Sequence, residues 1–250
     1  MTPARIARTL GALRRDLRGL AMIEFAFGAP LILLLGMCGI EMANYALVRM
    51  RISQVSMNIA DNASRVGLDT GLSTFQMTEG DVNDTIIGAA ISGKPLDLLT
   101  RGRIIISSLE MNAQGGQWSH WQRCKGAKVV DSAYGNEGTG ITGTAFAGMG
   151  PASARVTSTS TSTAVMYVEL FYDYPPLFPL MWSNAPDGKF LGAIFNNTLK
   201  SIKYGNSFMV RDNRDLNVDA ARNSGKGIFN PNNLLTNAPE PVSSCTVYTA

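Results

Sequence analysis

An apolar run near the N-terminus constrains this chain more than any other feature. Between Leu20 and Val48 the only charged residues are Glu24 and Glu41, and twelve of the side chains are Leu, Ile, Phe or Val. A helix needs about 20 apolar residues to cross a bilayer, so this run is long enough. At roughly −0.3 to −0.6 kcal/mol each, the twelve side chains contribute about −4 to −7 kcal/mol to insertion. We therefore predict a transmembrane helix over residues 20–48.

The positive charge of the chain is concentrated before this run. Residues 1–19 contain five arginines and one acid, Asp16, so this basic leader has a net charge of +4. Because the whole chain has a net charge of +3, the remaining residues carry about −1. By the positive-inside rule the leader stays in the cytoplasm and the chain after about residue 48 faces the other side. No Lys/Arg cluster with interleaved aromatics recurs later, so we expect no nucleic-acid partner. A cleaved secretory signal fits poorly, because the run is too long and no small-x-small site follows Gly39.

The helical pattern continues beyond the predicted membrane segment. Apolar side chains recur three or four residues apart and form one stripe: Val48, Ile52, Val55, Ile59, Ala63 and Val66. Gly67 is a suitable end, since the turn sequence Asp69-Thr70-Gly71 follows it. We therefore expect one helix from about residue 20 to 66, with residues 49–67 as its extramembrane continuation. Pro30 predicts a kink or local unwinding within it.

Residues 68–250 predict an exported α+β domain with a mostly antiparallel sheet. Thr78-Glu79-Gly80-Asp81 is typical of a helix start, and Gly93 and Pro95 end that helix. Further elements follow from composition and periodicity: a short helix at 95–100, a strand at 104–109, one long strand at 157–173, a short helix at 190–197, and strands at 200–204 and 207–212.

Two of the three cysteines lie in this polar region. Cys38 belongs to the apolar run and is expected to be a small buried hydrophobe. Cys124 and Cys245 can pair if the region lies outside the cytoplasm, and otherwise they are two unrelated free thiols. Because the membrane segment favours export, we predict that they pair. Residues 118–121, WSHW, are expected to form an aromatic core around this disulfide rather than a binding site.

Catalytic motifs do not stand out from this sequence. A single histidine excludes a metal site built on a histidine pair, and the cysteine spacing is wrong for zinc. Neither Gly-x-Ser-x-Gly nor His-Glu-x-x-His occurs, and no Gly-Lys-Ser/Thr ends the glycine-rich stretch 135–150. We therefore expect a protein that is not an enzyme and that needs no cofactor or metal.

The stretch RGLAMIEFAF at residues 18–27 carries a family resemblance. A basic leader, a glycine and an apolar helix with glutamate at its fifth position resemble a type IV pilin-like precursor. More narrowly, Gly19–Phe25 followed by Pro30 and Glu41 resembles TadE-like minor pseudopilins of Tad (Flp-type) pili. Residues 168–179 and 209–211 are similar to later strands of such proteins, whereas residues 68–160 match no part of the pattern.

The resemblance implies processing and a role for Glu24. A prepilin peptidase would cut between Gly19 and Leu20, although major pilins typically have Phe or Met where this chain has Leu20. A carboxylate at the bilayer centre costs about 2.5–3.5 kcal/mol, and less near an end. The resemblance favours pairing of Glu24 with the new α-amino group of a neighbouring subunit's Leu20. The alternative is a glutamate that reaches the headgroups and has no partner.

Together these features predict a minor pseudopilin that takes part in Tad pilus assembly. It would be a single-pass protein of the bacterial inner membrane, with its N-terminus in the cytoplasm and a pilin-like domain in the periplasm or in the extracellular pilus. Its partners would be the prepilin peptidase and the other pilins and pseudopilins of the pilus. The alternative is an uncleaved, signal-anchored periplasmic or surface module for binding or adhesion.

Overall fold

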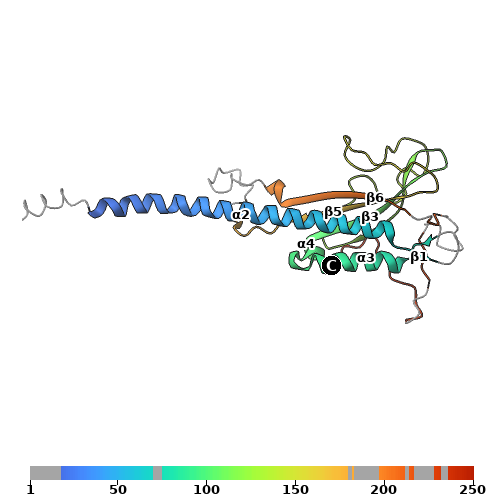
Figure 1. The fold of residues 1–250 in the computed structure, drawn as a ribbon, viewed down its shortest axis with the longest axis horizontal. Helices are drawn as coiled ribbons and strands as arrows, with labels where there is room; N and C mark the ends of the chain where they lie inside the picture. Colours follow the sequence, from blue (N-terminus) through green and yellow to red (C-terminus); the bar gives the residue numbers. More distant parts are fainter. Residues whose placement is uncertain are drawn as a thin grey trace, which may run out of the picture. The chain divides into compact units, whose positions relative to one another are not determined.

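The computed structural model describes residues 18–69, 75–179, 182, 197–211, 214–216, 228–231 and 236–250. The chain separates into two compact units, of which the first ends at Ala46 and the second comprises Leu47–Ala250. One long helix and a four-stranded antiparallel sheet dominate the described residues, which confirms the α+β class (Figure 1).

The long helix α2 spans Arg18–Arg65, close to the predicted 20–66. It is uninterrupted at Pro30, so of the predicted kink or local unwinding the unwinding is wrong. A proline removes a single backbone donor, and the hydrogen bonds on either side are enough to keep the helix intact. Five of the six members of the predicted apolar stripe are confirmed and are at most 8% exposed: Val48, Ile52, Val55, Ile59 and Ala63. The sixth, Val66, lies just after the end of α2 and is half-buried.

Four strands form the sheet in the order β4-β3-β5-β6, and every neighbouring pair is antiparallel. They are β3 (Gly102–Met111), β4 (Gln117–Lys125), β5 (Val165–Asp173) and β6 (Ser201–Met209). Smaller elements complete the described fold: β1 (Leu68–Asp69), β2 (Phe75–Gln76), α3 (Glu79–Ser92), the 3₁₀ turn η1 (Lys94–Leu96), α4 (Leu98–Arg101) and η3 (Asn197–Lys200).

The two faces of the sheet are covered by different parts of the chain. One face, called the helix-covered face, lies against α2 and η1. On it, the Tyr172 hydroxyl donates to the Leu96 carbonyl of η1 at 2.8 Å, and Asn206 Nδ2 donates to Ser56 Oγ of α2 at 2.8 Å. The loop-covered face carries two apolar clusters. Their buried members are Leu109, Met149, Val165 and Tyr167 in one, and Ile105, Cys124 and Phe171 in the other.

The start of α3 follows the predicted capping box. Thr78 Oγ1 accepts a hydrogen bond from the Asp81 backbone N–H at 3.2 Å, and Asp81 Oδ2 accepts from the Thr78 N–H at 2.9 Å. The short helix predicted at 95–100 is instead η1 followed by α4, because Asp97 between them adopts a left-handed conformation with φ of 50°.

The long strand predicted at 157–173 is wrong in its first half, since β5 begins only at Val165. The Ser158 hydroxyl lies within hydrogen-bond distance of the carbonyl oxygens of Ser160 (3.1 Å) and Thr163 (2.7 Å). Serine and threonine side chains that bond to nearby backbone in this way compete with strand pairing. The run of hydroxyl residues therefore forms a turn before the strand.

The two strands predicted at 200–204 and 207–212 are one strand, β6, with Gly205 at its centre. This glycine is needed for packing and not for a turn. A Cβ at Gly205 would lie 2.6 Å from the hydroxyl of Tyr167 on the neighbouring strand. Glycine inside a strand often marks such a close approach. The helix predicted at 190–197 lies outside the described residues except for Asn197, the first residue of η3.

Candidate functional site

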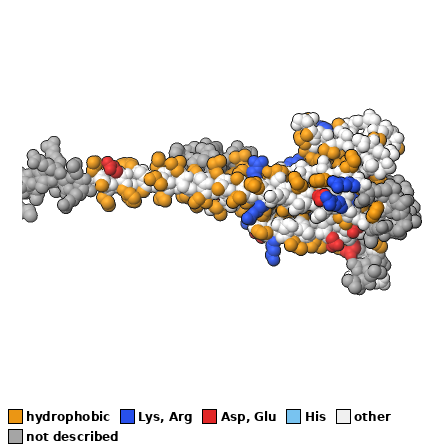
Figure 2. Space-filling view, viewed as in Figure 1, with side chains coloured by type: hydrophobic (Ala, Val, Ile, Leu, Met, Phe, Trp, Pro, Cys, Tyr) orange, Lys and Arg blue, Asp and Glu red, His pale blue; other side chains and the backbone are white. Residues whose placement is uncertain are grey.

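The N-terminal part of α2 is apolar and has no covering within its unit. By length and composition this helix can cross a membrane, and none of its most apolar 18-residue window is buried. Met22 is 72% exposed and Phe27 is 79% exposed, and hydrophobic side chains cover most of the visible face of this part of the helix (Figure 2). A helix that is apolar all round needs a nonpolar environment such as lipid or other helices.

The three predicted site residues of this segment lie on the helix within two turns. Gly19 has open space where a Cβ would stand, and Leu20 is 53% exposed. Glu24 follows Leu20 by four residues, so the two lie on one face of α2. Glu24 is exposed and forms no hydrogen bond or ion pair with the residues that the structure describes. Its carboxylate is therefore available to a group from another molecule.

Cys124 on β4 and Cys245 in the C-terminal segment form a disulfide, with a sequence separation of 121 residues. The segment also pairs with the outer edge of β4, because the Cys124 N–H donates to the Ser243 carbonyl at 2.8 Å and the Gly126 N–H donates to the Thr249 carbonyl at 3.1 Å. The disulfide thus joins the last residues of the chain to the sheet.

Arg103, on β3, fixes the same segment by a second route. Its side chain is buried, and Nη1 donates to the carbonyls of Gly126 (3.0 Å) and Val247 (3.1 Å). Nη2 donates to the carbonyl of Cys245 at 2.6 Å, and the guanidinium carbon lies 4.0 Å from the Tyr248 ring centroid. Desolvation lowers the pKa of Arg103, while Tyr248 and Asp131 act in the opposite direction. The arginine acts here as a structural clamp for the C-terminal segment.

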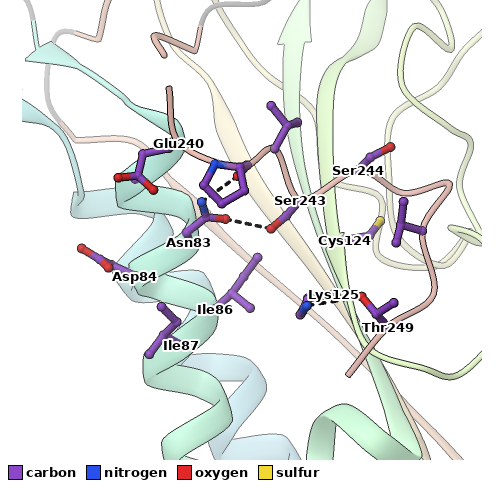
Figure 3. Close-up of a pocket in the computed structure, with 14 residues that line it drawn as sticks. Asn83, Asp84, Ile86, Ile87, Cys124, Lys125, Glu240, Ser243, Ser244 and Thr249 are labelled. Atoms are coloured by element: carbon purple, nitrogen blue, oxygen red, sulfur yellow. Dashed lines mark hydrogen bonds between the residues drawn. The ribbon is translucent and has the colours of Figure 1, made fainter. Parts of the chain in front are cut away.

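A cleft of about 490 Å³ lies between α3, the end of β4 and the C-terminal segment (Figure 3). Asn83 closes one side, since its Nδ2 donates to the Pro241 carbonyl at 2.8 Å and its Oδ1 accepts from Ser243 Oγ at 2.7 Å. Lys125 Nζ donates to Thr249 Oγ1 at 3.3 Å on the other side. The hydrogen bonds of Asn83, Ser243, Lys125 and Thr249 join the walls of the cleft, so these four side chains have a structural role there.

A β-bulge changes which face of β4 the aromatic residues occupy. Ser119 pairs with Leu109 and Gln122 pairs with Ser107, so two residues of β4 oppose one of β3 between these pairs. Trp118 and His120 consequently face away from Cys124. The prediction of an aromatic core around the disulfide is wrong, because Ile105 and Phe171 are the buried residues that pack with Cys124. Trp118 instead stacks on His120, with ring centroids 4.2 Å apart.

A buried ion pair connects the sheet to the start of α3. Arg123 Nε donates to both carboxylate oxygens of Glu79, at 3.1 Å and 2.9 Å. The two side chains are only 5% and 4% exposed. Arg123 Nη1 also lies 3.2 Å from Glu137 Oε2, and that carboxylate is 30% exposed. Arg123 is therefore the cation that neutralises a buried acid at the first residue of α3.

The sequence interpretation missed Arg103, Arg123 and Glu79. Arg103 and Arg123 each lie two residues from another cation, Arg101 and Lys125, and Glu79 lies two residues from Asp81. Charged side chains of this kind are usually in water, so nothing in the sequence marks these three as buried. Within the described ranges, no three His, Cys, Asp or Glu residues are grouped so that they could hold a metal ion. No protein-family model, curated protein or solved structure matches this chain.

Proposed function

We propose that this chain is a minor pseudopilin that takes part in assembly of a Tad-type pilus. A prepilin peptidase removes residues 1–19, the apolar part of α2 lies in the inner membrane, and the Leu47–Ala250 unit is in the periplasm. The observation that carries the proposal is the exposed apolar surface of α2 with Glu24 one turn after Leu20.

The cost of a charge in lipid explains why these two residues would act together. Glu24 lies near one end of the apolar segment, where an unpaired carboxylate costs less than the about 2.5–3.5 kcal/mol found at the bilayer centre. The amine that cleavage creates at Leu20 is a cation in the same low-dielectric region. Bringing the carboxylate of one subunit to the amine of the next neutralises both charges and fixes the register of the two helices.

The disulfide supports export of the second unit. Bonds between cysteines persist in the periplasm and outside the cell, whereas the cytoplasm keeps most thiols reduced. Cys124 and Cys245 both belong to the Leu47–Ala250 unit. The positive charge before the apolar segment predicts the same orientation.

The first test is the mature N-terminus. When the chain is made together with the pilus peptidase, intact-mass measurement is expected to show a product that begins at Leu20. Gly19→Val places a branched side chain at the cut and is expected to leave the leader in place. Cells without the peptidase supply the matched control. A full-length product in the presence of the peptidase would reject the processing step and favour an uncleaved anchor.

The second test separates assembly from insertion. Glu24→Ala is expected to reduce the number of assembled pili by at least about tenfold, since a loss of only about 1.4 kcal/mol per contact already has that effect. Membrane fractionation is expected to show unchanged insertion, because the substitution makes α2 more apolar. Met22→Ala, which removes a 72% exposed apolar side chain nearby, is the matched control and is expected to retain pili. Normal piliation by Glu24→Ala would exclude the proposed pairing.

A further inference from the structure

The two edge strands of the four-stranded sheet differ in whether their outward backbone groups have hydrogen-bond partners. At the β4 edge, the chain covers its own backbone groups: the Ser119 N–H donates to the Thr139 carbonyl at 2.9 Å, and Ser243 and Thr249 accept from the far end of the strand. β6 forms the opposite edge, and within the described ranges β5 is the one strand that pairs with it. An uncovered edge presents a row of backbone donors and acceptors to another chain.

The hydrogen bonds to β5 identify which groups of β6 point outward. The Val210 N–H donates to the Ala164 carbonyl at 3.0 Å, and the Tyr174 N–H donates to the Lys200 carbonyl at 2.8 Å. In an antiparallel pair this alternation continues, so the even-numbered residues of β6 bond to β5. Lys203, Gly205 and Ser207 therefore direct their N–H and C=O groups away from the sheet. Among the residues that the structure describes, none bonds to these groups.

The usual protections of a free edge are weak here. β6 is nine residues long, contains no proline and pairs with β5 in one continuous register without a bulge. Its one charged side chain, Lys203, lies 3.2 Å from the buried Glu169 Oε1 and so leans over the loop-covered face. Gly205 is exposed and has no side chain to keep a second strand away. Natural edge strands are more often short, bulged or charged along the edge.

We propose that the β6 edge is a docking site for an extended, acidic segment of a different protein chain. Outward groups at every second residue match the repeat of an extended backbone, which is the basis of recognition by strand addition. Residues 197–211 contain no acid, and two cations, Lys200 and Arg211, lie near the two ends of β6, whereas the charge of Lys203 is already met by Glu169. Neither Lys200 nor Arg211 forms an ion pair in the described part of the chain. Acidic side chains on the added strand would complement this charge.

A second copy of β6 does not fit this edge. Arg49 lies 6.0 Å from the Tyr204 ring and Ser56 bonds to Asn206, so the Leu47–Arg65 part of α2 and β6 run in the same direction. Antiparallel pairing of two β6 strands would also make the two Leu47–Arg65 segments antiparallel, so their Leu47 ends would point in opposite directions, which does not suit two chains that both leave one membrane just before Leu47. That step rests on the proposed function. In a parallel pair, each residue bonds to the residues before and after its partner. Because only the odd-numbered residues of β6 direct their backbone groups outward, two parallel copies of β6 could pair only if one were shifted by one residue relative to the other. A two-fold axis relates the two copies without any shift, so it excludes this pairing.

The test uses the purified full chain in detergent and a fluorescent nine-residue peptide of alternating threonine and glutamate. We expect the peptide to bind, as measured by fluorescence anisotropy. Methylation of its alternate backbone nitrogens, which blocks strand pairing, is expected to weaken binding by at least about tenfold. A peptide with lysine in place of glutamate is expected to bind at least about tenfold more weakly, since like charges then meet at the edge.

Ser207→Pro supplies the sharpest variant. Proline is tolerated in an edge strand where the missing N–H points outward, so β6 and β5 remain paired. Ser207→Pro is expected to weaken peptide binding by at least about tenfold, while the matched control Ser207→Ala, which keeps the N–H, binds as the unmodified chain does. An unchanged free energy of unfolding and an intact Cys124–Cys245 disulfide would show that the Ser207→Pro variant is folded.

Several outcomes would overturn the proposal. They are the absence of peptide binding, binding that methylation of the peptide or Ser207→Pro leaves unchanged, equal binding of the lysine peptide, and dimerisation of the full chain through β6. If Ser207→Pro does not fold, the methylated and lysine peptides still decide the question on the unmodified chain. The assay needs neither cleavage at Gly19 nor assembled pili, so its failure is distinguishable from failure of the proposed function.

Discussion

Replacing both Cys124 and Cys245 by serine is expected to lower the free energy of unfolding of the Leu47–Ala250 unit by about 4–5 kcal/mol. The disulfide closes a loop with a sequence separation of 121 residues, and the entropy that such a bond removes from the unfolded chain grows with loop length. Domains are typically stable by about 5–15 kcal/mol, so the loss would be a large part of the total. The clamp by Arg103 would remain, but it acts only in the folded state.

Urea unfolding followed by tryptophan fluorescence measures this effect, because Trp118 and Trp121 both lie in β4. Cys38→Ser is the matched control, since Cys38 forms no disulfide and belongs to the first unit. It is expected to leave the unfolding transition unchanged. The prediction is wrong if the double serine variant unfolds at the same urea concentration, or if both thiols of the native, unreduced protein react with an alkylating reagent.

The elements that the sequence predicts well are those with local causes. The stripe of apolar residues in α2 repeats at the helical period over residues 48–63, and each of its members named above is buried. The Thr78–Asp81 capping box involves residues three apart, so its sequence pattern contains both partners. The strand at 104–109 lies within β3 for a similar reason, since its composition alone favours extended backbone.

The errors come from features that depend on a neighbouring strand. The bulge opposite Ser108 is set by the pairing of β3 with β4, and it turns Trp118 away from Cys124 although the spacing alone would place both on one face. Gly205 is typical of a turn when the sequence is considered alone. In the structure, glycine is required at this position because a Cβ would lie too close to the hydroxyl of Tyr167 on β5, and no local sequence pattern reveals that contact.

The buried charges show the same limit at longer range. Arg103 donates to the Cys245 carbonyl across 142 positions of sequence, and Arg123 bonds to Glu79 across 44. Composition cannot indicate which of the 22 basic residues has a buried partner. By contrast, the interpretation of Gly19, Leu20 and Glu24 came from a contiguous stretch, and it stays a prediction until the N-terminus of the mature protein is measured.

Arg123→Met is the second substitution with a large expected effect. It removes the cation from Glu79, whose side chain is only 4% exposed, and leaves a carboxylate buried without its partner. Breaking a buried pair in this way typically costs about 3–5 kcal/mol, and we expect a loss of that size in the free energy of unfolding. Glu137 loses the same cation, but its side chain is 30% exposed and can be hydrated, so it adds little to the loss of unfolding free energy.

Three further variants show whether the buried charge is the cause. Replacing both partners, as Glu79→Leu with Arg123→Met, leaves no unpaired charge and is expected to recover most of the loss, since buried pairs are often replaceable by apolar residues. Arg65→Met breaks the exposed pair with Asp61, in which the side chains are 59% and 32% exposed, and is expected to cost less than about 1 kcal/mol. Urea unfolding of the unmodified chain, Arg123→Met, Glu79→Leu and the double variant completes a double-mutant cycle and gives the coupling energy of Glu79 and Arg123. Equal losses from Arg123→Met and Arg65→Met would mean that water reaches Glu79, and the pair would then not stabilise the contact between α3 and the sheet.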